Sequence, residues 1–203
     1  MSYLPKAQTF GLVYQGGLGC NAKVFRGRVE GVDGEVAIKV ARNNGESTQN
    51  DMVQEFKDSV ELSSILPNAA RYHSMVQVES HSSSPAFAME IIRGMTILNR
   101  NIHLYFSYDF KDILSQKAVA QLRENLQVAR DNMWFRKDLQ YFLLTEDQVI
   151  NEKEHERGDL ILFDFGYWEK NMSDIDHNYD SVAMPTRNLE SLIHPDAREI
   201  TRQ

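Results

Sequence analysis

Cysteine, long apolar runs and an excess of basic charge are all missing from this sequence of 203 residues. The single cysteine, Cys20, excludes an intrachain disulfide and fits a protein of a reducing compartment. No apolar run reaches the roughly 18 residues of a membrane-spanning helix, and MSYLPKAQTF lacks the layout of a secretory signal. The net charge of −7 argues against a nucleic-acid partner, because phosphate backbones require a basic face.

What is present is an ordinary globular composition with 42% apolar residues, enough for one domain or two small lobes around a cleft. Apolar runs separated by glycine turns predict a sheet rich in hairpins, followed by an amphipathic helix that stops before Pro67. The strands are expected at 9–15, 22–31, 34–40, 75–80 and 86–92, and the helix at 48–66.

The second half predicts a helix over 115–132 with Ser115 as its N-cap. A strand pair is expected from YFLL (141–144) and LILF (160–163), joined by the charged run 151–159, which is interpreted as a solvated hairpin tip. The polar residues after Gly166 are expected to be only partly ordered. The six histidines show no spacing typical of metal ligands. The fold class is therefore α+β, with a β-rich first half.

Glycines 16, 17 and 19 precede the second predicted strand. Gly17-Leu18-Gly19, with Val24 five residues on, matches most of the pattern G-x-G-x-x-G-x-V, with Ala22 in place of the third glycine. Glycines let backbone amides approach phosphates because no Cβ intervenes. An ordinary glycine hairpin is the alternative.

Lys39 lies inside the apolar run Val36-Ala37-Ile38-Lys39, 22 residues after Gly17. A buried ammonium is costly without an anionic partner. V-A-I-K on a strand at this distance from a glycine loop is typical of protein kinases, and the chain resembles that family. The resemblance implies that Lys39, with Gly17, Gly19, Val24 and Ala37 around it, binds the phosphates of ATP.

A glutamate on the next helix would hold Lys39 in such a protein. Glu55 lies 16 residues after Lys39, and Glu61 is the competitor. We favour Glu55, because it shares a helix face with Ser59, Leu62 and Leu66. The alternative is that both glutamates are solvated helix charges.

Two further segments extend the resemblance. Met89-Glu90-Ile91-Ile92 resembles the kinase hinge, with Met89 as gatekeeper and backbone groups of Glu90 and Ile92 on the adenine edge; a plain buried strand is the alternative. Asp164-Phe165-Gly166 after LILF matches D-F-G, which implies that Asp164 holds Mg²⁺, a cation that prefers hard oxygen ligands.

The catalytic loop departs from the family pattern H-R-D-L-x-x-x-N. The nearest match is Arg136-Lys137-Asp138-Leu139, in which Asp138 would accept or orient the substrate hydroxyl proton. Leu143, or Phe142 if one residue is deleted, occupies the place of the asparagine that ligates a second metal. The departure keeps a pseudokinase open as an alternative.

Only 37 residues follow Gly166 in this sequence, too few for the substrate platform of an ordinary protein kinase. The layout resembles minimal effector kinases of bacterial type III secretion, such as the OspG, NleH and Hop-type kinases. That resemblance implies a two-lobed kinase-like fold, with an N-lobe at 1–94 and a truncated C-lobe at 95–203. It further implies a monomeric, secreted serine/threonine protein kinase that uses ATP and Mg²⁺ in the host cytosol. Its substrate would be a host protein, with a chaperone and a ubiquitin-pathway protein both open; a small-molecule kinase is a third option.

Overall fold

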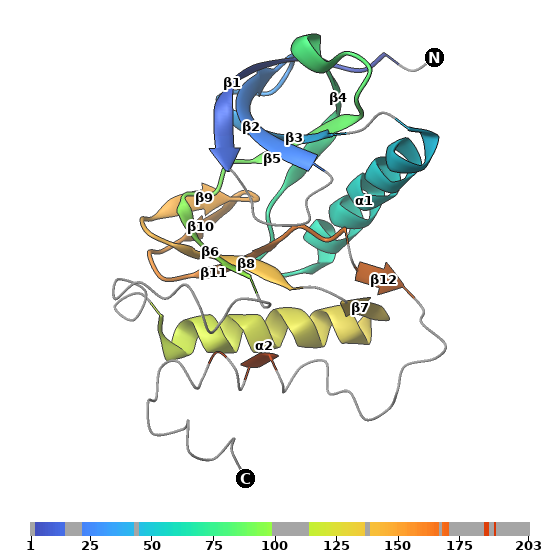
Figure 1. Ribbon diagram of the computed structural model, residues 1–203. Helices are drawn as coiled ribbons and strands as arrows, with labels where there is room; N and C mark the ends of the chain where they lie inside the picture. Colours follow the sequence, from blue (N-terminus) through green and yellow to red (C-terminus); the bar gives the residue numbers. More distant parts are fainter. Residues whose placement is uncertain are drawn as a thin grey trace. The chain divides into compact units, whose positions relative to one another are not determined.

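The protein has an α+β fold, seen in a computed structural model (Figure 1) that describes residues 3–14, 22–42, 45–98, 114–136, 139–166, 168–170, 185–186 and 189. The chain divides into two compact units. The first comprises Met1–Glu61 and Ala70–Ile91, and the second comprises Leu62–Ala69 and Ile92–Gln203. No helix within the described ranges is long and apolar enough to cross a membrane.

The first unit is built on a closed five-stranded barrel with the strand order β1-β2-β3-β5-β4. Its strands are β1 (Lys6–Tyr14), β2 (Ala22–Val29), β3 (Val36–Ala41), β4 (Tyr72–Val78) and β5 (Ala86–Glu90). All neighbours pair antiparallel except β1 and β4, which are parallel. Small and β-branched side chains such as Val36, Ile38, Val76 and Ala88 fill the core.

Gly27 on β2 is required by close packing inside this barrel. A Cβ at this position would lie 2.3 Å from the carbonyl oxygen of Gln8 and 2.3 Å from Cδ1 of Ile38. No side chain fits at such distances, so the glycine lets β1, β2 and β3 approach one another.

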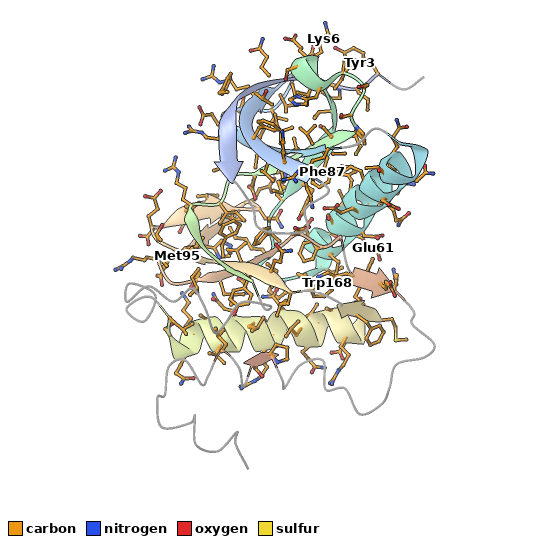
Figure 2. All side chains as sticks on the ribbon, in the orientation of Figure 1. Tyr3, Lys6, Glu61, Phe87, Met95 and Trp168 are labelled. Atoms are coloured by element: carbon orange, nitrogen blue, oxygen red, sulfur yellow. The ribbon has the colours of Figure 1, made fainter. Side chains whose placement is uncertain are left out.

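Helix α1 (Glu46–Ile65) begins in the first unit, and its last turn belongs to the second. Its Phe56 packs on Phe87 of β5, with 5.7 Å between ring centroids, and Tyr72 of β4 contacts the same Phe87 ring at 5.8 Å. Phe87, labelled in Figure 2, is fully buried. The aromatic contacts therefore fix the face of α1 that turns toward the barrel.

The second unit contains one long helix and several short strands. Its elements are β6 (Gly94–Leu98), α2 (Gln116–Asp131), β7 (Trp134–Arg136), β8 (Gln140–Leu144), β9 (Gln148–Ile150), β10 (Lys153–His155), β11 (Leu160–Phe163) and β12 (Trp168–Lys170). They form a three-stranded sheet β11-β8-β6 and the pairs β10-β9 and β12-β7. Apolar residues of α2, including Leu122 and Leu126, are buried.

The barrel strands β1, β2, β3 and β5, both helices and the β8–β11 pair occur close to where the sequence predicts them, and Ser115 caps α2 through its hydroxyl. The strand predicted at 75–80 is displaced, because β4 spans Tyr72–Val78 and a 3-10 turn follows. The interpretation of 151–159 as a solvated tip is wrong: it contains β10, and His155 and Asp159 are buried.

Candidate functional site

Lys39 forms an ion pair with Glu55. Its Nζ lies 2.5 Å from Oε1 of Glu55, and each side chain is 14% exposed. The same Nζ is 5.9 Å from the centroid of Phe87, a cation–π distance. The partner that a lysine in an apolar strand requires is therefore supplied by α1. Of the two glutamates left open by the sequence, the structure pairs Lys39 with Glu55, whereas Glu61 is exposed near the end of α1 (Figure 2).

The strand register places three other candidate residues around Lys39. Val24 on β2 is the direct cross-strand partner of Lys39. Ala37, two residues before Lys39 on β3, is paired with Met89 on β5. Residues two apart on a strand share a face, so Val24, Ala37, Lys39 and Met89 line one face of three adjacent strands. In the sequence these four residues are related only by the order of the motifs to which they belong. The strand register shows that they are neighbours in space.

Glu90 ends β5 and is tied to the residue before β4. Its backbone N–H donates to the carbonyl of Arg71 at 2.9 Å, and its Oε2 accepts from the N–H of Arg71 at 3.0 Å. The backbone N–H of Glu90 is therefore already engaged within the first unit. Ile92 belongs to the second compact unit and is half-buried.

Asp164 follows the buried strand β11 directly in the second unit. Its φ of 57° lies in the left-handed region, which is uncommon for a residue with a Cβ and is concentrated at functional sites. Phe165 beside it is fully buried and packs edge-on against Trp168 at 5.5 Å. The neighbouring aromatic packing thus holds the backbone that orients the Asp164 carboxylate.

The chemistry of Asp164 fits magnesium as one of several ligands. A carboxylate oxygen is a hard donor, and Mg²⁺ is usually bound by one or two carboxylates plus phosphate and water oxygens. No group of three or more His, Cys, Asp or Glu side chains in the described part of the chain could hold a metal.

The structure describes the residues on either side of the segment proposed as a catalytic loop. Arg136 closes β7 and is paired with Trp168 of β12, while β8 starts at Gln140. Asp138 itself, like Gly17 and Gly19, lies outside the described residues, so their roles stay predictions. Leu143, in the place expected for an asparagine, is fully buried inside β8.

Residues whose role the sequence did not suggest hold the end of α1. Asn151 donates its Nδ2 hydrogen to the carbonyl of Ser63 at 3.1 Å, and Lys153 donates from Nζ to the carbonyl of Pro67 at 3.1 Å. In the sequence, the one feature that indicates a tight hairpin turn here is the residue type of Asn151, because asparagine tolerates the left-handed conformation that such a turn requires.

An exposed lysine on the first turn of α2 is paired with the buried Asp159, which also contacts the buried His155, around the turn before β11. Lys117 Nζ lies 2.7 Å from Oδ1 of Asp159, and His155 Nδ1 lies 3.6 Å from Oδ2. Burial alone would raise the pKa of Asp159, but the bonds from Lys117 and the backbone of Glu156 lower it overall. Burial lowers the pKa of His155 from its ordinary value of 6.5, and neighbouring Asp159 only partly opposes this. The group is therefore an ion pair beside a histidine whose neutral form is favoured by burial.

Comparison with models of known protein families gives no match to this chain, and no curated protein matches it.

Proposed function

We propose that this protein is an ATP-dependent serine/threonine protein kinase of a minimal type. The observation that carries the proposal is the Lys39–Glu55 pair, with 2.5 Å between Nζ and Oε1 on adjacent elements of one compact unit. An ammonium held by a carboxylate at 14% exposure keeps its charge and a fixed direction. Such a group suits the α- and β-phosphates of a nucleotide.

The proposed mechanism assigns one task to each residue. Lys39 binds phosphate oxygens, and Glu55 keeps the ammonium oriented. Asp164 would hold magnesium, which when bound neutralises charge on the β- and γ-phosphates. The γ-phosphoryl group passes to a substrate hydroxyl as its bond to the bridging oxygen of ADP breaks, and the hydroxyl proton passes to Asp138.

The same proposal extends to architecture and substrate. The barrel with α1 would be the nucleotide-binding lobe of a kinase-like fold, and the unit with α2 a reduced second lobe. We propose a host protein as substrate and delivery by a secreting bacterium, on the resemblance to minimal effector kinases. We propose that the aromatic stretch 105–108 and the tail 167–203 contribute to the choice of the target protein; both lie largely outside the described residues.

Transfer of radiolabelled γ-phosphate from ATP tests the proposal. The purified protein is incubated with ATP, Mg²⁺ and a eukaryotic cell extract, and Lys39→Ala and Asp164→Ala are compared with the unaltered chain. We expect incorporation that both substitutions abolish. Incorporation that survives both would refute the assignment.

A nucleotide-binding pseudokinase is the second candidate, and the start of β8 favours it. Because the strand begins at Gln140 and buries Leu143, no asparagine is available at the position expected for the second metal ligand. Such a protein would gain thermal stability from ATP by linkage, without turnover. Autophosphorylation that Asp138→Asn depresses by roughly 10²–10⁴ would exclude it.

A further inference from the structure

Phe87 (Figure 2) is buried on the outer face of the barrel of the first unit. Both of its neighbours in sequence are alanines of the barrel core. Successive side chains of a strand point to opposite faces, so the ring of Phe87 points away from that core. Because the ring is nevertheless fully buried, side chains outside the barrel must cover it. Those that contact it include Lys39, Phe56 and Tyr72.

Lys39 and Phe87 are direct partners on adjacent strands. The register of β3 and β5 pairs the two residues, so their side chains leave the same face of the sheet. The Nζ atom of Lys39 lies over the ring, 5.9 Å from its centroid. A cation over an aromatic face at about this distance is attracted by the negative charge of the π system, and more strongly where water is kept away. The Lys39 side chain is only 14% exposed, which favours such an attraction.

The same ring also contacts the helix that carries the glutamate. Phe56 follows Glu55 directly on α1, and its ring centroid lies 5.7 Å from that of Phe87. The two rings are tilted by 41°, an arrangement that is favourable beyond the area it buries. One side chain of the first unit therefore contacts both Lys39 and the residue next to the glutamate that pairs with it.

We propose that Phe87 is a positioning residue for the Lys39–Glu55 pair. The face of its ring holds the ammonium, while its contact with Phe56 holds the turn of α1 from which Glu55 reaches Lys39. A lysine side chain has a flexible four-carbon stem, so a second attractive contact limits the positions that Nζ can take beside the carboxylate. The inference concerns the ion pair, and its importance for ATP rests on the proposed function.

Fluorination of Phe87 tests the inference without requiring activity. Ring fluorines withdraw electron density from the aromatic face and so weaken its attraction for a cation, while the side chain keeps nearly the same shape. Phe87→trifluorophenylalanine is made in the full chain by stop-codon suppression, with Phe87→monofluorophenylalanine as the intermediate step. Each protein is treated with a limiting amine-acylating reagent at constant pH, and acylation of Lys39 is followed by peptide mass spectrometry.

The acylation rate should rise with the number of fluorines, because the reaction requires the free amine and the ring stabilises the ammonium. We expect roughly threefold faster acylation of Lys39 in Phe87→trifluorophenylalanine, which corresponds to about 0.7 kcal/mol, and a smaller increase with one fluorine. Phe87→Leu removes both the aromatic face and the ring contact with Phe56, so it should speed the reaction at least as much.

Phe25→trifluorophenylalanine is the matched control. Phe25 is paired with Ile38 and packs against the barrel core of the same unit, on the face of the sheet opposite to Lys39. This change should leave the acylation rate of Lys39 as it is in the unaltered chain.

Equal rates of Lys39 acylation in the unaltered chain and in Phe87→trifluorophenylalanine would overturn the inference, as would an equal increase in the Phe25 variant. An unaltered rate in Phe87→Leu would also contradict it. Protection of Lys39 by ATP is scored separately in the same experiment. If ATP fails to protect Lys39 while fluorination of Phe87 still raises its reactivity, the proposed function fails and the positioning role stands.

Discussion

Removing one member of the Lys39–Glu55 pair should cost far more stability than removing both. With each side chain only 14% exposed, a single deletion leaves a largely buried charge. Breaking a fully buried pair costs about 3–5 kcal/mol, and residual access to water lowers our expectation to about 2–4 kcal/mol. Replacing both partners by apolar side chains of similar volume is expected to be nearly neutral, because neither charge then needs a partner.

The assay is a double-mutant cycle of Lys39→Met, Glu55→Leu and the combined variant, measured by urea denaturation. We expect a coupling free energy of about 2 kcal/mol or more. The exposed pair Arg26–Glu35, at 56% and 36% side-chain exposure, is the matched control and should couple by about 1 kcal/mol or less. Two single variants within about 0.5 kcal/mol of the unaltered protein, with no coupling, would refute the reasoning.

Three further substitutions probe packing and titration. Gly94→Ala should destabilise by about 2 kcal/mol or more in urea denaturation, because the added Cβ would lie 2.5 Å from Leu143 O; an unchanged midpoint would contradict this. Ser59→Ala should stabilise by about 1 kcal/mol, since this buried hydroxyl finds no partner among the described residues; a loss of stability would show that it has one. Because the folded-state pKa of His155 is lowered from 6.5, its stabilising effect should be lost as the pH falls from about 6.5 through that lower value, and His155→Gln should flatten the measured dependence.

Local patterns were sufficient to predict most of the barrel strands and to limit the partners of Lys39 to two glutamates. Lys39 lies in a run of apolar residues, and the next amphipathic helix presents Glu55 on its apolar side. The helical periodicity and the expected burial of Lys39 together limited the possible partners of this lysine. The choice between Glu55 and Glu61 needed the actual rotation of α1, which is set by the packing of Phe56 on Phe87.

The elements that the sequence missed are short or held by remote partners. Strands β9, β10 and β12 have three residues each, too few to show a period, and β10 is largely charged. Asn68 is hydrogen-bonded to Asn125, which is 57 residues away in the sequence, and Ser63 is hydrogen-bonded to Asn151, which is 88 residues away. No local pattern encodes such contacts, so the interpretation of 151–159 as a solvated tip overlooked them.

The central claim is that Lys39 contacts the phosphates of a bound nucleotide. An acyl-phosphate derivative of ATP tests it most directly, because this reagent acylates the lysine amine that lies beside the phosphates, and peptide mass spectrometry then identifies the residue. We expect preferential labelling of Lys39 that excess ATP suppresses and that Asp164→Asn weakens. Labelling spread over exposed lysines such as Lys117, with no suppression by ATP, would contradict it.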